Sequence, residues 1–127
     1  MKSKEDIIEY RLGRSDETIK EALLLRSNGH FNSTVNRLYY AAFYAASAVL
    51  YKQDIYSKTH SGLKSLFHEH LIKTQKISNE NGKVYQQLFE YRQDGDYGDF
   101  IIFDKEEVNA LFERTQLLIN EIKKLIK

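Results

Sequence analysis

Hydrophobic residues recur along this chain at the three- and four-residue spacing of an amphipathic α-helix. The pattern is clearest near the C-terminus, where a helix is predicted to begin at Asp104, a favourable N-cap residue. The predicted inward positions of this helix follow a 3-4-3-4-3 spacing and are Val108, Leu111, Thr115, Leu118, Ile122 and Leu125. A stripe of this kind docks along the other helices of a bundle.

Two further helices are predicted in the first half of the chain. The first covers residues 4–28, has a weak point at Gly13 and ends at Gly29, a residue suited to a helix terminus. Its residues at helical spacing are Ile8, Leu12, Ile19 and Leu23. The second begins at Asn32 or Ser33, either of which can cap it, and runs to about Gln53.

The third and fourth helices are predicted over residues 59–73 and 79–93. Their inward positions are Leu63, Leu66, Phe67 and Leu71 in the third helix and Val84, Leu88 and Tyr91 in the fourth. No strand-like alternation persists, and the absence of proline removes one cause of helix breaks. The fold class is therefore all-α: an antiparallel helical bundle of about five helices, forming one domain over residues 1–127.

Composition and charge limit the function classes. The chain has 127 residues, of which 42% are hydrophobic and 29% charged, as in an ordinary soluble domain. The formal net charge of +1 gives no global basic field, so nucleic-acid binding would require a local cationic patch. With no cysteine, neither a disulfide nor a thiolate can take part in the chemistry.

The apolar segments are short. The first residues lack the apolar stretch of a secretory signal. The longest apolar run, about a dozen residues within 39–50, is shorter than the ~20 that a membrane-spanning helix needs. We therefore expect a cytoplasmic protein without a membrane partner.

Residues 91–100 form the most polar segment with specific turn chemistry, Tyr-Arg-Gln-Asp-Gly-Asp-Tyr-Gly-Asp-Phe. We predict a loop after the fourth helix, where polar side chains on a rigid scaffold often carry function. Arg92 either holds a phosphate or caps the fourth helix and pairs with Asp94 or Asp96. Tyr97 either stacks on a base or packs the loop against the bundle.

A second segment, residues 36–46, reads Asn-Arg-Leu-Tyr-Tyr-Ala-Ala-Phe-Tyr-Ala-Ala. Its alanines allow a neighbouring backbone to approach closely, and its aromatic residues exceed what one small core requires. We therefore expect a symmetric homodimer through this helix and the loop after the fourth helix. Arg37, which has Tyr40 nearby, either faces the same cleft as Arg92 or forms an interface contact or internal ion pair.

Neither a metal nor another cofactor is expected. Asp94, Asp96 and Asp99 do not match a calcium-binding EF-hand, because Asp99 occupies the glycine position and Lys105 the position of the closing glutamate. Among the histidines, His60 stands at a predicted helix start, where it can bind an anion. We favour a capping, solvent-facing role for it.

Three segments together resemble a known family. Residues 32–46, residues 58–62 (Lys-Thr-His-Ser-Gly) and residues 88–97 are similar, in this order, to the HEPN (higher eukaryotes and prokaryotes nucleotide-binding) domain of small prokaryotic proteins. The resemblance implies an all-α bundle that dimerises and lines a cleft with polar residues of both copies. It also implies, for many relatives, a metal-independent ribonuclease activity that depends on an arginine followed after four to six residues by a histidine.

The chain departs from that motif at its histidine. Arg92 matches the arginine, but positions 97–99 hold Tyr97, Gly98 and Asp99. An unperturbed tyrosine has a pKa near ~10 and cannot replace histidine as a general base at neutral pH. We therefore expect a non-catalytic module. An alternative is a ribonuclease toxin with an altered active site that uses Arg92, Asp94 and Tyr97, and another is a plain helical scaffold.

The expected function is weak binding of RNA or a nucleotide in a dimer cleft. The residues expected to contact the ligand are Arg37, Tyr40, Arg92, Asp96 and Tyr97. By family analogy, the protein works in a toxin–antitoxin-like system with a small nucleotidyltransferase encoded alongside it. Carboxylates near the arginines repel a phosphate backbone, so low and salt-dependent affinity is expected.

Overall fold

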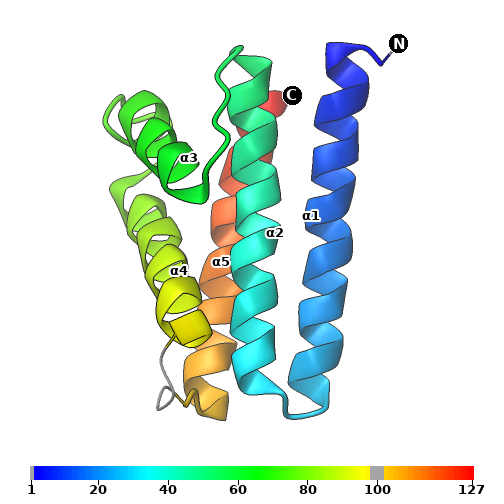
Figure 1. Cartoon of the computed structure of the whole chain (residues 1–127), viewed down its shortest axis with the longest axis vertical. Coiled ribbons are helices and arrows are strands. Elements are labelled where there is room, and N and C mark those ends of the chain that lie inside the picture. The colour runs from blue at the N-terminus through cyan, green and yellow to red at the C-terminus, as the bar shows by residue number, and fades with distance from the viewer. Residues whose placement is uncertain (1, 98–101) are drawn as a thin grey trace.

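The chain folds into a bundle of long antiparallel helices, shown in Figure 1. This computed structural model describes residues 2–97 and 102–127, and describes side chains up to residue 93 and from residue 102 onward. The helices of the described residues are α1 (Lys4–Ser27), α2 (Phe31–Lys52), α3 (His60–Phe67), the π-helical turn η1 (His68–Ile72), α4 (Asn79–Tyr97) and α5 (Lys105–Ile126). The described part contains no strand, and the predicted all-α bundle is confirmed.

Helix α2 lies at the centre of the bundle and contacts α1, α3, α4 and α5. Its apolar residues supply much of the core, including Leu38, Tyr39 and Leu50, which are fully buried. The last helix meets this core as predicted. Its residues that are buried as expected are Val108, Leu111, Thr115, Leu118 and Ile122.

Small residues allow α1 and α2 to pack closely. The Ser15 hydroxyl of α1 is buried and donates a 2.7 Å hydrogen bond to the Ala41 carbonyl oxygen of α2. The buried face of α1 consists of Ile8, Ser15, Thr18 and Ala22. Leu23, one of the apolar residues at helical spacing in the sequence, does not belong to this face, because it is 44% exposed. Apart from Ile8, the buried face of α1 therefore carries short side chains rather than the most apolar ones.

The alanines of α2 do not form the surface that was expected to meet a second copy of the chain. Ala41, Ala42, Ala45 and Ala46 are fully buried within the chain, so they offer no surface to a second copy. The alanines do let a neighbouring backbone approach, but that neighbour is α1 of the same chain. Within residues 36–46 of this helix, the aromatic residues that remain partly exposed are Tyr40, Phe43 and Tyr44.

The connection between α1 and α2 uses Gly29 as predicted. Gly29 has a φ of +76°, and the amides of Gly29 and His30 bond the carbonyl oxygens of Arg26 and Leu25. This is the Schellman pattern that ends many helices. The prediction that Asn32 or Ser33 caps α2 is wrong, because α2 begins at Phe31.

Asn32 instead fastens the start of α2 to the segment before α5. Its side-chain oxygen accepts a 3.2 Å hydrogen bond from the Phe103 amide. Phe103 is buried, and its ring meets Tyr91 edge-on at 4.9 Å between centroids. Asp104 then caps α5, as predicted, by accepting a bond from the Glu107 amide at 2.8 Å.

The third predicted helix ends in the π-helical turn η1, where the Lys73 amide bonds the His68 carbonyl oxygen. A π turn holds one more residue than an α turn, so it changes which residues face inward. Leu71 and Ile72 are consecutive and are both buried. Ile72 packs so close to Gly82 of α4 that a Cβ there would lie 2.9 Å from the Ile72 Cγ2 atom.

Helix α4 is longer than predicted and continues to Tyr97 rather than ending near residue 93. Residues 94–97, which were predicted to belong to a loop, are therefore helical, and Arg92 lies inside a helix instead of at its end. Because α4 continues for five residues beyond Arg92, the alternative in which Arg92 caps this helix is wrong.

Candidate functional site

Arg92 of α4 reaches across to Tyr40 of α2. Its Nε donates a hydrogen bond to the Tyr40 hydroxyl at 3.3 Å. The guanidinium carbon of Arg92 lies 5.7 Å from the centroid of the Tyr40 ring and 5.5 Å from that of Tyr39. Cations at this distance are attracted by the negative face of an aromatic ring. Two tyrosines of the central helix therefore hold the arginine that the sequence singled out.

Arg37 contacts the same tyrosine from within α2. Its guanidinium carbon lies 4.9 Å from the Tyr40 ring centroid. The structure thus brings together Arg37, Tyr40 and Arg92, three of the predicted site residues, and we call them the arginine–tyrosine cluster. Tyr40 is the shared neighbour because α2 carries it one turn after Arg37 and α4 packs beside it.

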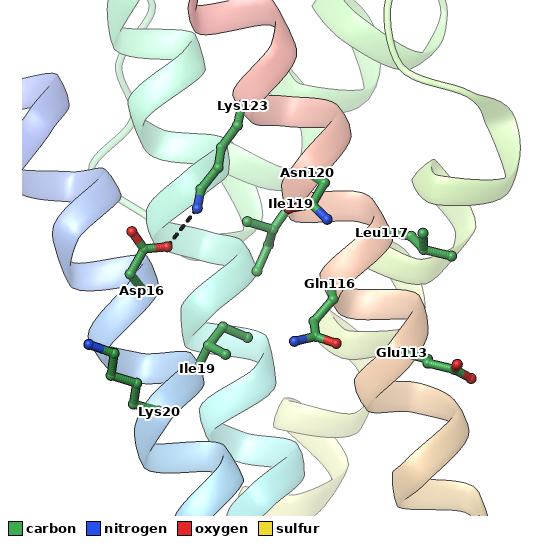
Figure 2. A pocket seen from close by; sticks show the side chains of 9 residues that line it. All are labelled: Asp16, Ile19, Lys20, Glu113, Gln116, Leu117, Ile119, Asn120 and Lys123. Atoms are coloured by element: carbon green, nitrogen blue, oxygen red, sulfur yellow. Dashed lines mark hydrogen bonds and ion pairs between the residues drawn. The ribbon is translucent and has the colours of Figure 1, made fainter.

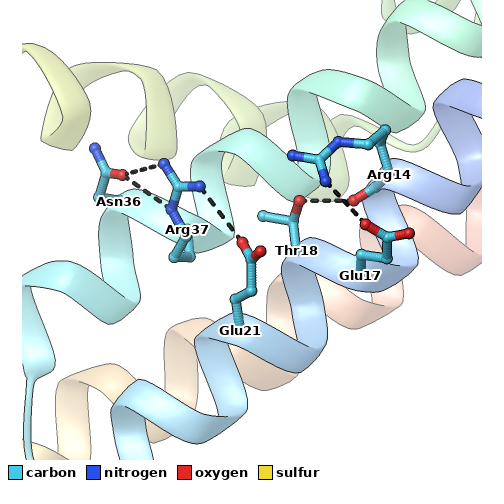
Figure 3. Close-up of polar contacts among 6 residues, drawn as sticks. All are labelled: Arg14, Glu17, Thr18, Glu21, Asn36 and Arg37. Atoms are coloured by element: carbon cyan, nitrogen blue, oxygen red, sulfur yellow. Dashed lines mark hydrogen bonds and ion pairs between the residues drawn. The ribbon is translucent and has the colours of Figure 1, made fainter.

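Asn36 and Glu21 orient the Arg37 side chain (Figure 3). The Asn36 side-chain oxygen accepts bonds from Nη2 at 2.9 Å and from Nε at 3.3 Å. Nη1 lies 3.5 Å from the Glu21 carboxylate, which comes from α1. Arg37 is 31% exposed, and an ion pair this open contributes little stability. The internal ion pair, one of the alternatives for Arg37, is therefore present, and the guanidinium also lies against the Tyr40 ring.

A cavity of about 250 Å³ lies on one side of Arg92. Its polar lining comes mainly from the start of α2, and its apolar lining comes from Val35, Tyr91 and Phe103. The residues that line it are Asn32, Ser33, Val35, Asn36, Tyr91, Arg92 and Phe103. Amide and hydroxyl groups beside a guanidinium can bind the oxygens of a phosphate or a sugar.

His60 lies against the arginine–tyrosine cluster, a position that was not predicted from the sequence. Thr59, not His60, caps α3 by accepting a bond from the Gly62 amide at 2.9 Å. The His60 ring stacks on Phe43 with 4.4 Å between centroids and lies 5.8 Å from Tyr40. The favoured reading of His60 as a solvent-facing cap is therefore wrong.

Tyr39 makes a direct bond to His60. The hydroxyl oxygen of Tyr39 and Nδ1 of His60 are 2.7 Å apart. Burial raises the pKa of Tyr39 to about 12, although the charge of Arg92 opposes this rise. Burial lowers the pKa of His60, and the positive charge of Arg92 lowers it further. His60 and Arg92 therefore interact electrostatically although 31 positions separate them in the sequence.

The Tyr85 hydroxyl lies deeper in the same aromatic group. Its ring stacks on Phe67 at 4.9 Å and lies 6.3 Å from Tyr39. Burial raises its pKa well above the ordinary value, and Tyr39 adds to that rise. Among the described groups, the Tyr39 hydroxyl is the polar group with which it interacts, although no hydrogen bond of good geometry joins the two. Tyr85 therefore stays protonated, and its ring packs in the hydrophobic core.

Several predicted site residues cannot be placed. The side chains of Asp94, Asp96 and Tyr97 and all of Asp99 lie outside the described residues. Within the described part, no three His, Asp or Glu side chains are arranged to hold a metal ion. Similarly, no helix in that part is both long and apolar enough to cross a membrane.

A second cavity, of about 580 Å³, lies between α1 and α5 (Figure 2). Lys123 of α5 bonds Asp16 of α1 across it at 2.6 Å. Its other lining residues are Ile19, Lys20, Glu113, Gln116, Leu117, Ile119 and Asn120. The cavity contains none of the residues predicted from the sequence to bind a ligand, and its two bridging charges neutralise each other.

Comparison with known proteins gives the family of the chain. The sequence profile of the HEPN domain matches residues 8–125. A UPF0332 protein of Thermotoga maritima is 39% identical over 127 residues, which cover 100% of this chain and 96% of the relative. "Putative toxin MJ0142" of Methanocaldococcus jannaschii is 28% identical over 119 residues, covering 94% of this chain and 81% of the relative. Because the profile match spans most of the sequence and the relatives align along nearly all of it, the protein belongs to the HEPN domain family.

Proposed function

We propose that the arginine–tyrosine cluster binds a phosphate group of RNA or of a nucleotide. The observation that carries this proposal is that two guanidinium groups from different helices, Arg37 and Arg92, lie against one tyrosine ring. Each guanidinium can form charge-assisted, two-pronged bonds to phosphate oxygens. An anion that contacts both also offsets their mutual repulsion.

The wider proposal is a non-catalytic HEPN module that acts in a toxin–antitoxin-like system with a small nucleotidyltransferase. The word toxin in the names of two relatives supports a role in a toxin–antitoxin-like system. We further propose a homodimer in which the partly exposed aromatic residues of α2 are covered and two copies of Arg92 approach each other. An adjacent nucleotidyltransferase gene, and co-purification of its product, would support the partner.

The binding test uses a short 2′-O-methyl RNA, which cannot be cleaved at its 2′ position, and AMP as a competitor. Loss of a charge-assisted bond costs about 1.5–3 kcal/mol, so Arg37→Gln and Arg92→Gln should each weaken binding about tenfold or more. Arg114→Gln, at an exposed position of α5, is the matched control and should bind like the wild type. Equal affinity of all four proteins would refute the proposed site. Displacement of the RNA by AMP would identify a mononucleotide as sufficient.

A second candidate function is metal-independent RNA cleavage, and the position of His60 favours it. This imidazole comes from α3 and its pKa is influenced by Arg92. It could therefore serve as the general base, a role that Tyr97 cannot fill at neutral pH. The test is incubation of a mixed RNA pool without metal. Cleavage that is lost in both Arg92→Ala and His60→Gln would replace the non-catalytic proposal. Cleavage seen only in Tyr97→His would instead indicate a nuclease scaffold without its base.

A further inference from the structure

Besides the guanidinium groups of Arg37 and Arg92, the imidazole of His60 also lies close to Tyr40. The ring centroid of His60 lies 5.8 Å from that of Tyr40, and the guanidinium carbons of Arg37 and Arg92 lie 4.9 and 5.7 Å from the same ring. These three groups come from α3, α2 and α4. They therefore converge on one ring although no short sequence motif links them.

The bond from Tyr39 determines which nitrogen of His60 carries the proton. Tyr39 remains protonated in the physiological range because burial raises its pKa to about 12. Its hydroxyl can then donate to Nδ1 of a neutral His60 ring, 2.7 Å away. A neutral imidazole that accepts at Nδ1 carries its hydrogen on Nε2. Nε2 is thus a donor in both charge states, and it becomes a charge-assisted donor when the ring is protonated.

We propose that His60 is a third phosphate-binding residue of the cluster and that it takes up a proton when the phosphate binds. This inference rests on the proposed function, because it assigns a further ligand residue and a pH dependence to the same site. The ligand is defined by its phosphate oxygens, which an imidazolium and two guanidinium groups would bind together.

The charges around His60 explain why protonation should accompany binding. Arg92 faces it from α4, and Tyr39 and Tyr40 face it from α2. On its own helix, Lys64 lies one turn further along, over the Phe89 ring. In the free protein, burial and then Arg92 lower the pKa of His60, so the ring is neutral at pH 7. A bound phosphate brings negative charge, which raises the pKa.

Proton uptake gives a pH dependence with a definite sign. Affinity should increase as pH falls through the higher pKa of the complex, and should level off below the lower pKa of the free protein. One proton per site limits the slope to about tenfold in affinity per pH unit. Arginine does not titrate in this range, so the two guanidinium groups add no slope of their own.

The experiment measures binding of the 2′-O-methyl RNA between about pH 5.5 and 8, which brackets the ordinary histidine pKa. Its phosphodiesters do not titrate in this range, so any slope comes from the protein. Wild type should bind more tightly as pH falls, whereas His60→Gln should lose that slope. His68→Gln, at an exposed histidine of η1, is the control and should keep the slope. Equal slopes for wild type and His60→Gln would overturn the inference.

A second readout does not depend on nucleic acid. Nuclear magnetic resonance of isotope-labelled histidine rings gives the pKa of His60 directly, and His60→Gln assigns its signal. Saturating sulfate, an anion that does not titrate near neutral pH, should raise this pKa, and no change would overturn the inference. In contrast, the proposed function fails if Arg37→Gln and Arg92→Gln bind the RNA as tightly as the wild type. Arg-dependent binding with an unchanged His60 pKa would therefore refute the inference alone.

Discussion

Replacing Ser15 tests how closely α1 and α2 pack. Ser15 is fully buried, and its hydroxyl bonds the Ala41 carbonyl oxygen at 2.7 Å. Ser15→Ala removes this bond but leaves no isolated acceptor, because a helical carbonyl also accepts a bond from the amide four residues later. The expected loss is therefore that of one neutral hydrogen bond, about 0.5–1.5 kcal/mol.

Ser15→Val should be worse than Ser15→Ala. Compared with alanine, valine adds two methyl groups at a position with no exposed surface, opposite the buried alanines of α2. Overpacking of this kind typically costs about 1–3 kcal/mol, and here the lost hydrogen bond is added to it. For a chain of this length, each kcal/mol lost from the free energy of unfolding lowers the melting temperature by about 4 °C.

Thermal and urea unfolding followed by circular dichroism would measure these changes. The matched control is Ser27→Ala, which removes a similar hydroxyl bond, to the Leu23 carbonyl oxygen at 2.9 Å, at an exposed position of the same helix. Its effect should stay within about 0.5 kcal/mol. If Ser15→Val were as stable as the wild type, the close packing of α1 against α2 would be refuted.

Three other predictions concern the core, pH and assembly. Leu118→Ala should cost about 2–5 kcal/mol by leaving a cavity, whereas its neighbour Leu117, which is 62% exposed, should tolerate alanine; equal losses in urea unfolding would contradict this. Because the pKa of folded His60 is below 6.5, the unfolded chain binds the proton first as pH falls below 6.5. Wild type should therefore lose stability relative to His60→Gln in that window, and parallel pH curves of the unfolding free energy would disprove it. Finally, light scattering at high micromolar concentration should give a homodimer mass, and a monomer would exclude the proposed assembly.

The bundle could be predicted because the apolar periodicity and the terminal residues of its helices can be recognised within each segment of the sequence. The apolar stripe of α5, the Asp104 cap and the Gly29 terminus are local features that tertiary packing left unchanged. The inward face of α1 was less predictable, because Ser15 and Thr18 occupy it instead of the more apolar Leu23. Where two backbones approach closely, the size of a side chain outweighs its hydropathy.

The site was only partly predictable for a related reason. Arg37, Tyr40 and Arg92 stood out because they lie in segments with unusual composition, and the structure brings them together. The end of α4 was misplaced because Gly95 indicated a turn although the helix continues to Tyr97. His60 was missed because its neighbours, Tyr39 and Arg92, are distant in sequence, and no spacing rule relates them.

The π-helical turn has an evolutionary consequence. It turns Ile72 towards Gly82, where a Cβ would come within 2.9 Å of the isoleucine side chain. Positions 72 and 82 should therefore vary together among homologues, with a larger residue at 82 accepted only beside a smaller one at 72. Deleting one residue from η1 would convert the turn to an ordinary α turn, rotate Ile72 away and release that constraint. The extra residue of the turn thus makes a glycine in α4 depend on a side chain in η1.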